Sequence, residues 1–120
     1  MNMKQCEERH HQAMQMVDRA MHARRTGDDA SVQMALREAF LLEKEAAAFV
    51  VGQFDLEPTR SVLHRSAASL ALQIGELREG ERLLGAALAG FPPEEIAEEL
   101  RDLMERIYLK RGRKGLQSVA

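Results

Sequence analysis

The clearest hydrophobic pattern in this chain lies in two consecutive segments, residues 58–74 and 76–90, which meet at Gly75. Apolar side chains in both segments recur at the spacing of one helix face; they are Leu63, Ala67, Leu70, Ala71 and Ile74, then Leu77, Leu84, Ala87 and Leu88. A glycine at the junction can adopt the left-handed conformation that often ends a helix. The gap allows only a tight turn, so the pattern predicts two antiparallel helices. Pro92 and Pro93 then stop the second helix.

Residue sizes indicate how the two helices of this hairpin pack. We expect Ala67, Ala68 and Ala71 on one helix to face Gly80 and Ala87 on the other. Such small residues let two backbones approach closely. Larger neighbours supply the apolar area, and each stabilises by about 1.5–3 kcal/mol when buried; they are Leu70, Ile74, Leu83, Leu84 and Leu88.

At these positions the chain resembles the helical hairpin of the tetratricopeptide-repeat family. The resemblance is carried by the order and spacing of small and large residues and by the closing proline: Ala67, Ala68, Ala71, Gly75, Gly80, Leu84, Ala87 and Pro92. The chain departs from the family at His64, where a large aromatic is usual, and at Ala71, where tyrosine is frequent. The resemblance covers one unit, under half of the chain, and implies a right-handed stack of helix pairs.

Two further helices are predicted before this hairpin. The first spans about residues 4–25 and carries an apolar stripe that includes Met14, Val17 and Met21. Gly27 caps its end, and Asp28 or Asp29 can accept hydrogen bonds from the free amides of the next helix. The second helix spans about residues 30–51. Its apolar set is too broad for one stripe, which predicts contact on two sides, with another helix or with a second subunit.

A connection and a last helix complete the predicted chain. Phe54 and Leu56, in the connection at residues 52–58, are expected to tuck back against the helices. The fifth helix begins near Pro93, and its one-sided apolar stripe is typical of a terminal cap. We therefore predict an all-α fold without strands: five helices, as two antiparallel hairpins plus a C-terminal capping helix in a tetratricopeptide-like stack. Residues 1–110 form this single domain, and residues 111–120 a basic flexible tail.

Composition and charge narrow the class of protein. The chain has 120 residues, 45% hydrophobic and 30% charged, with a net charge of −2, which argues against a nucleic-acid binder. One cysteine excludes an internal disulfide and suits a reducing cytoplasm. We see no secretory signal and no run approaching the roughly 18 apolar residues of a membrane span. These features predict a cytoplasmic protein without membrane association.

Metal chemistry has one candidate cluster, Cys6, Glu7, Glu8, His10 and His11. Two Glu-x-x-His spacings in it match the ligand pattern of di-iron helix bundles, but such a site needs a second pair on another helix. Neither of the other two histidines has a glutamate three residues before it. We therefore predict no metal and no other cofactor, and expect the cysteine and histidines to be exposed.

Catalytic chemistry is equally sparse. His64 lies near Arg60 and Arg65, but a catalytic histidine needs an orienting partner and a pocket. The interpretation we favour is that His64 fills a half-buried packing position. The chain shows no phosphate-binding loop, nucleophile motif or zinc spacing, so we predict that it is not an enzyme.

The family resemblance implies a binding surface instead, since the first helix of each tetratricopeptide pair lines a concave groove that holds peptides. The matching positions are Val62, Arg65, Ser69, Leu72 and Gln73 in one hairpin and Met14, Val17, Met21 and Arg24 in the other. The family's carboxylate-binding version uses lysine and asparagine there, whereas this chain has Arg65 and Ser69. An alternative is that Met14, Val17 and Met21 are simply core residues.

Two hypotheses remain for function. The first is a small adaptor or scaffold that binds a protein or peptide partner through this groove, and a homodimer through the broad apolar faces of the first two helices is compatible with it. The alternative is a helical-bundle protein that binds metal through the Cys6–His11 cluster or nucleic acid through the basic residues Lys110–Lys114. Four charges at a chain end support only weak, salt-sensitive nucleic-acid binding.

Overall fold

A computed structural model describes residues 1–119 of the chain, with side chains for residues 1–112. Its elements are five helices, α1 (Met3–Arg25), α2 (Asp29–Val50), α3 (Thr59–Ile74), α4 (Leu77–Leu88) and α5 (Glu94–Val119). Residues 1–119 contain no strand. The predicted all-α class and the number and order of the helices are therefore confirmed, and most helix ends lie within two residues of the expected positions.

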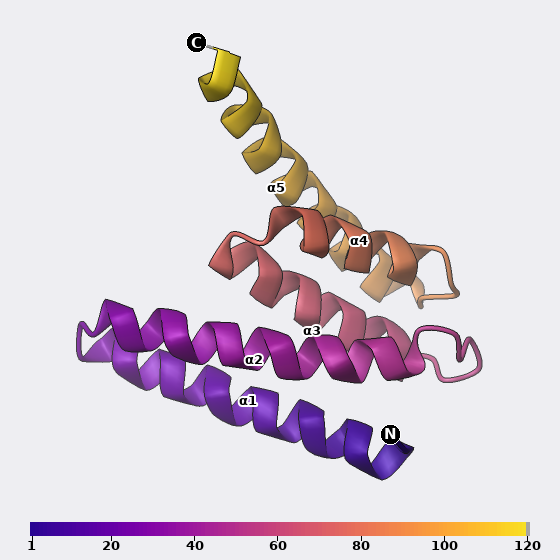
Figure 1. The fold of residues 1–120 in the computed structure, drawn as a ribbon. Helices are drawn as coiled ribbons and strands as arrows, with labels where there is room; N and C mark the ends of the chain where they lie inside the picture. Colours follow the sequence, from indigo (N-terminus) through magenta and orange to yellow (C-terminus); the bar gives the residue numbers. More distant parts are fainter. Residues whose placement is uncertain (120) are drawn as a thin grey trace.

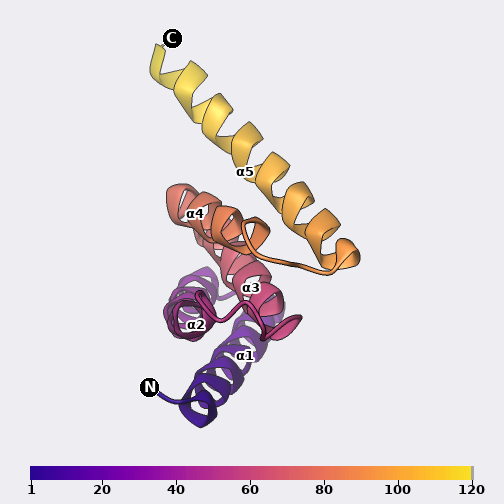
Figure 2. The same cartoon turned by 90° about the vertical axis from the view of Figure 1, so that its right-hand side faces the viewer.

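The helices pack in sequence order, each against its neighbour (Figure 1). α1 and α2 lie side by side, α3 packs on α2 and α4 on α3, and α5 contacts both α3 and α4. Figure 2 shows these elements as successive layers from α1 to α5. The broad apolar set of α2 is explained by its position between α1 and α3. Two large apolar residues of α2 nevertheless face solvent, Met34 and Leu41, which are 74% and 55% exposed.

Both glycine turns have the local chemistry that the sequence predicts. Gly75 ends α3 in the left-handed conformation with a φ of 80°, and Gly27 follows α1 with a φ of 76°. The side chain of Asp28 accepts a hydrogen bond from the Ser31 amide and caps α2. Each turn reverses the chain, so α1 with α2, and α3 with α4, form the two expected hairpins.

The close approach predicted at Gly80 is also observed, and α5 takes part in it. A Cβ atom at Gly80 would lie 3.4 Å from the Ala71 Cβ atom and 2.8 Å from the Ile107 Cδ1 atom. Ile107 is fully buried. Small residues at this point therefore bring three helices together, α3, α4 and α5.

The C-terminal region differs from the prediction of a tail that starts at residue 111. α5 continues as a helix to Val119 and projects past the other helices (Figure 1). Ala120 and the side chains of Arg113 and Lys114 lie outside the described residues. No helix in the described part of the chain has the length and apolar character that crossing a membrane requires.

Candidate functional site

A groove of about 490 Å3 lies on the described surface between α1, α3 and α5. Its lining combines apolar side chains from all three helices with hydrogen-bonding and charged ones from α3 and α5: Met14, Val17, Arg65, Ser66, Ser69, Leu70, Gln73, Glu99, Asp102, Leu103 and Arg106. This mixture suits the binding of a ligand that has both apolar and polar groups.

Helix α3 supplies the middle of the groove. Arg65, Ser69 and Gln73 are four residues apart, so successive turns present them on one face. The Arg65 guanidinium donates a hydrogen bond to Glu99 of α5 over 2.8 Å. This ion pair joins the two walls of the groove, so the charge of Arg65 is already compensated within the protein.

Only part of the predicted groove surface comes together. Met14, Arg65, Ser69 and Gln73 line it, as does Val17. The other predicted residues do not line it: Met21 and Arg24 are exposed farther along α1, Val62 is half-buried, and Leu72 is buried. Met14 and Val17 are both half-buried. Val17 also packs against the core, so it combines the groove and core positions that the sequence left as alternatives.

Sequence reasoning missed the wall that α5 contributes. Its groove residues Glu99, Asp102, Leu103 and Arg106 recur at helical spacing beside the buried stripe of the same helix. That periodicity was visible in the sequence, but the interpretation of α5 as a cap assigned its polar face to solvent. The groove charges therefore depend on α5 as much as on α3.

His64 is a buried structural residue rather than a half-buried one. It is 1% exposed, and its Nδ1 atom lies 2.7 Å from the Arg60 carbonyl oxygen, to which it donates a hydrogen bond. Burial is the main cause that lowers the pKa of this imidazole. A substrate cannot reach a side chain in this position, so the hypothesis of acid–base catalysis at His64 has no geometric support.

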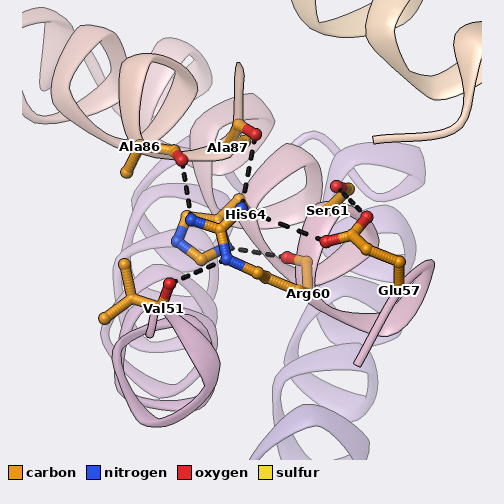
Figure 3. A network of polar contacts seen from close by, with 7 residues as sticks. All are labelled: Val51, Glu57, Arg60, Ser61, His64, Ala86 and Ala87. Atoms are coloured by element: carbon orange, nitrogen blue, oxygen red, sulfur yellow. Dashed lines mark hydrogen bonds and ion pairs between the residues drawn. The ribbon is translucent and has the colours of Figure 1, made fainter. Parts of the chain in front are cut away.

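Arg60 forms the centre of the network around His64 (Figure 3). Its guanidinium is buried and donates to the carbonyl oxygens of Val51, Ala86 and Ala87 at 2.7, 2.8 and 3.3 Å. These oxygens lie at the C-terminal ends of α2 and α4, where helical carbonyls lack partners within their own helix. One arginine thus joins the two hairpins.

The connection before α3 packs differently from the prediction. Phe54 does not tuck in, because it is 48% exposed. Its ring stacks over the Arg60 guanidinium at 4.7 Å from the ring centroid and meets Phe91 edge-on. Leu56, in contrast, is partly buried against the core as expected.

The N-terminal cluster of α1 also differs from the expected exposed arrangement. Cys6 is 1% exposed, and its thiol donates a weak hydrogen bond to the Ala46 carbonyl oxygen at 3.4 Å. The His10 Nδ1 atom lies 2.8 and 2.9 Å from the two carboxylate oxygens of Glu43 on α2. Only His11 is exposed as predicted.

Glu43 of α2 also belongs to this cluster, although the sequence analysis did not identify it. It is completely buried, and burial raises the pKa of its carboxyl, while hydrogen bonds from Ser66 and His10 act in the opposite direction. Because Ser66 lines the groove, this carboxyl lies between the groove and the N-terminal cluster.

Within the described residues, no group of three or more histidine, cysteine, aspartate or glutamate side chains is arranged to hold a metal ion. Within the groove, Arg65 is ion-paired with Glu99, and Asp102 and Arg106 are exposed to solvent. Comparison with known proteins adds no further constraint, since no family model, curated protein or solved structure matches the chain.

Proposed function

We propose that the chain is a small tetratricopeptide-like module that binds a segment of a partner protein in the groove between α1, α3 and α5. The observation that supports this proposal is the lining of the groove. The first helix of each hairpin and the last helix all face it, and together they present Met14, Val17, Ser69 and Gln73. In the resemblance drawn from the sequence, the first helix of each hairpin, here α1 and α3, is the one that holds a peptide.

The groove chemistry defines the kind of segment that fits. Met14 and Val17 offer apolar contact, and methionine adapts to irregular partners. Ser69 and Gln73 can hydrogen-bond to peptide groups. Because Arg65 is paired with Glu99, its guanidinium is not free to bind a terminal carboxylate. An internal segment with apolar and uncharged polar side chains is therefore the proposed ligand.

Site-specific photo-crosslinking in cells that produce the protein tests this proposal. A photoreactive residue is placed at Ser69 in the groove and, as a matched control, at Met34, which is 74% exposed on α2. We expect a crosslinked partner peptide from position 69 and not from position 34. Crosslinking at both positions to the same protein, or no crosslink from position 69, would contradict a groove-bound partner. A crosslink from position 69 to a second copy of this chain would instead identify self-association.

The groove also needs a loss-of-binding variant that leaves the fold intact. Arg65 is a poor choice, because its removal breaks the pair that joins α3 to α5. Gln73→Glu is preferable, since Gln73 is exposed and lines the groove. We expect this added charge to reduce the yield of the crosslinked partner, with Gln33→Glu on the exposed face of α2 as the matched control.

A further inference from the structure

A second cavity, of about 200 Å3, lies where the beginning of α1 meets the beginning of α3. It is more enclosed by apolar side chains than the groove, and its lining also includes three side chains with sulfur or nitrogen donors: Met3, Cys6, Glu7, His10, Leu56, Thr59 and Leu63. The proposed function makes no use of this cavity.

The three donor side chains come from one face of one helix. Met3, Cys6 and His10 are separated by three and four residues, a spacing that stacks side chains on consecutive turns. A thioether, a thiol and an imidazole therefore line the same space. The thioether supplies a third donor beside Cys6 and His10, outside the set of histidine, cysteine and carboxylate ligands.

Glu43 orients the imidazole in the way that metal-binding histidines require. Its carboxylate lies 2.8–2.9 Å from the His10 Nδ1 atom. Because Nδ1 is paired with Glu43, Nε2 is the ring nitrogen that remains available to a metal ion. Histidine ligands of metal ions nearly always have such a partner on the other ring nitrogen.

The electrostatics of the cavity favour a cation. Glu7 lines the cavity, and the Glu43 carboxyl lies against His10. The same two carboxylates attract a positive ion. Metal binding would displace the Cys6 thiol proton to solvent and replace it with a cation.

We propose that Met3, Cys6 and His10 form a binding site for copper(I) in this cavity. Thiolate and thioether ligands select soft ions of this kind, whereas a structural zinc site usually has four cysteine, histidine or carboxylate ligands. In the bound state the Cys6 Sγ atom, the Met3 Sδ atom and the His10 Nε2 atom coordinate the ion, and Glu43 is a positioning residue. The thiol loses its hydrogen bond to Ala46 and no electron is transferred.

An anaerobic titration of the purified full chain tests the site. Copper(I) is added in competition with a coloured copper(I) chelator, and zinc(II) is titrated separately. We expect one copper(I) per chain, with an affinity that falls at least about tenfold in Met3→Leu and in His10→Gln, and by more in Cys6→Ser. Glu43→Gln should lower it by about 10–100-fold, the range for second-shell partners of metal ligands. Far-UV circular dichroism verifies that each variant remains helical.

Two matched controls separate this site from binding to an isolated thiol. Met16→Leu changes another partly buried methionine of α1, and His11→Gln changes the exposed neighbouring histidine. Neither residue lines the cavity, so neither variant should alter the affinity. The proposal is overturned if Cys6→Ser alone weakens binding, if the controls weaken it as much as Met3→Leu and His10→Gln do, or if zinc binds more tightly than copper(I). These outcomes are independent of the crosslinking result in the groove.

Discussion

Two glycines of α4 provide a direct test of the contact between α4 and α5. Gly80 faces Ile107, and a Cβ atom there would lie 2.8 Å from the Ile107 Cδ1 atom. Gly85 is on the same helix, but a Cβ atom there would have no heavy atom within 4 Å. Replacing each with alanine adds the same methyl group to the same helix in a crowded and in an open position.

The two substitutions should change the free energy of unfolding in opposite directions. Alanine in place of a glycine inside a helix stabilises by about 0.5–1 kcal/mol, because the unfolded glycine has more backbone freedom. Gly85→Ala should show this gain alone. In Gly80→Ala the same gain is opposed by a steric cost, because the added methyl group enters a core that is already filled; such overpacking destabilises by about 1–3 kcal/mol. Ile107 is completely buried, so its methyl group cannot move into solvent. We expect a net loss of about 1–2 kcal/mol for Gly80→Ala.

Urea unfolding followed by circular dichroism measures both variants. Ile107→Val, which removes the crowded Cδ1 atom, completes a double-mutant cycle with Gly80→Ala. The cost of Ile107→Val should be smaller in the Gly80→Ala background than in the natural sequence. If Gly80→Ala is as stabilising as Gly85→Ala, the close packing of α4 against α5 at Ile107 is refuted.

Three further predictions use the same unfolding assay. Burial lowers the pKa of His64 below the ordinary histidine value of about 6.5. Below that pH the unfolded chain binds a proton that the folded chain does not, so the free energy of unfolding should fall as the pH is lowered from about 7 to 5. The decrease should be smaller in His64→Asn. Arg60→Met removes three charge-assisted hydrogen bonds and should destabilise by about 3–6 kcal/mol; a loss below about 1 kcal/mol would contradict the network. Gly75→Ala places a Cβ atom at a φ of 80° and should destabilise by about 1–2 kcal/mol.

The parts of the fold that were predicted from the sequence depend on interactions between residues that are close together along the chain. Gly75 and the Asp28 cap act on their own turn, and the spacing of the apolar residues defines each helix face. The contact of Gly80 with α3 was also predictable, because the short turn at Gly75 makes α3 and α4 pack against each other as antiparallel neighbours. Its second neighbour, Ile107, lies 27 residues away along the chain and has no local signal at Gly80.

The parts that the sequence did not predict are buried polar residues with distant partners. Glu43 lies in the apolar run of α2, and the histidine that makes its burial tolerable is 33 residues earlier. Without its partner a buried carboxylate is costly, so burial of Glu43 and its pairing with His10 can only be predicted together. The expectation that Cys6 is exposed failed for the same reason, because the polar start of α1 packs against this part of α2.

The buried carboxyl of Glu43 also connects the two candidate sites. Its oxygens lie 2.9 and 2.8 Å from the Nδ1 atom of His10, which lines the small cavity, and Ser66, which lines the groove, acts to lower the pKa of the same carboxyl. His10 belongs to α1 and Ser66 to α3, so this residue of α2 is adjacent to a residue of each of these two helices.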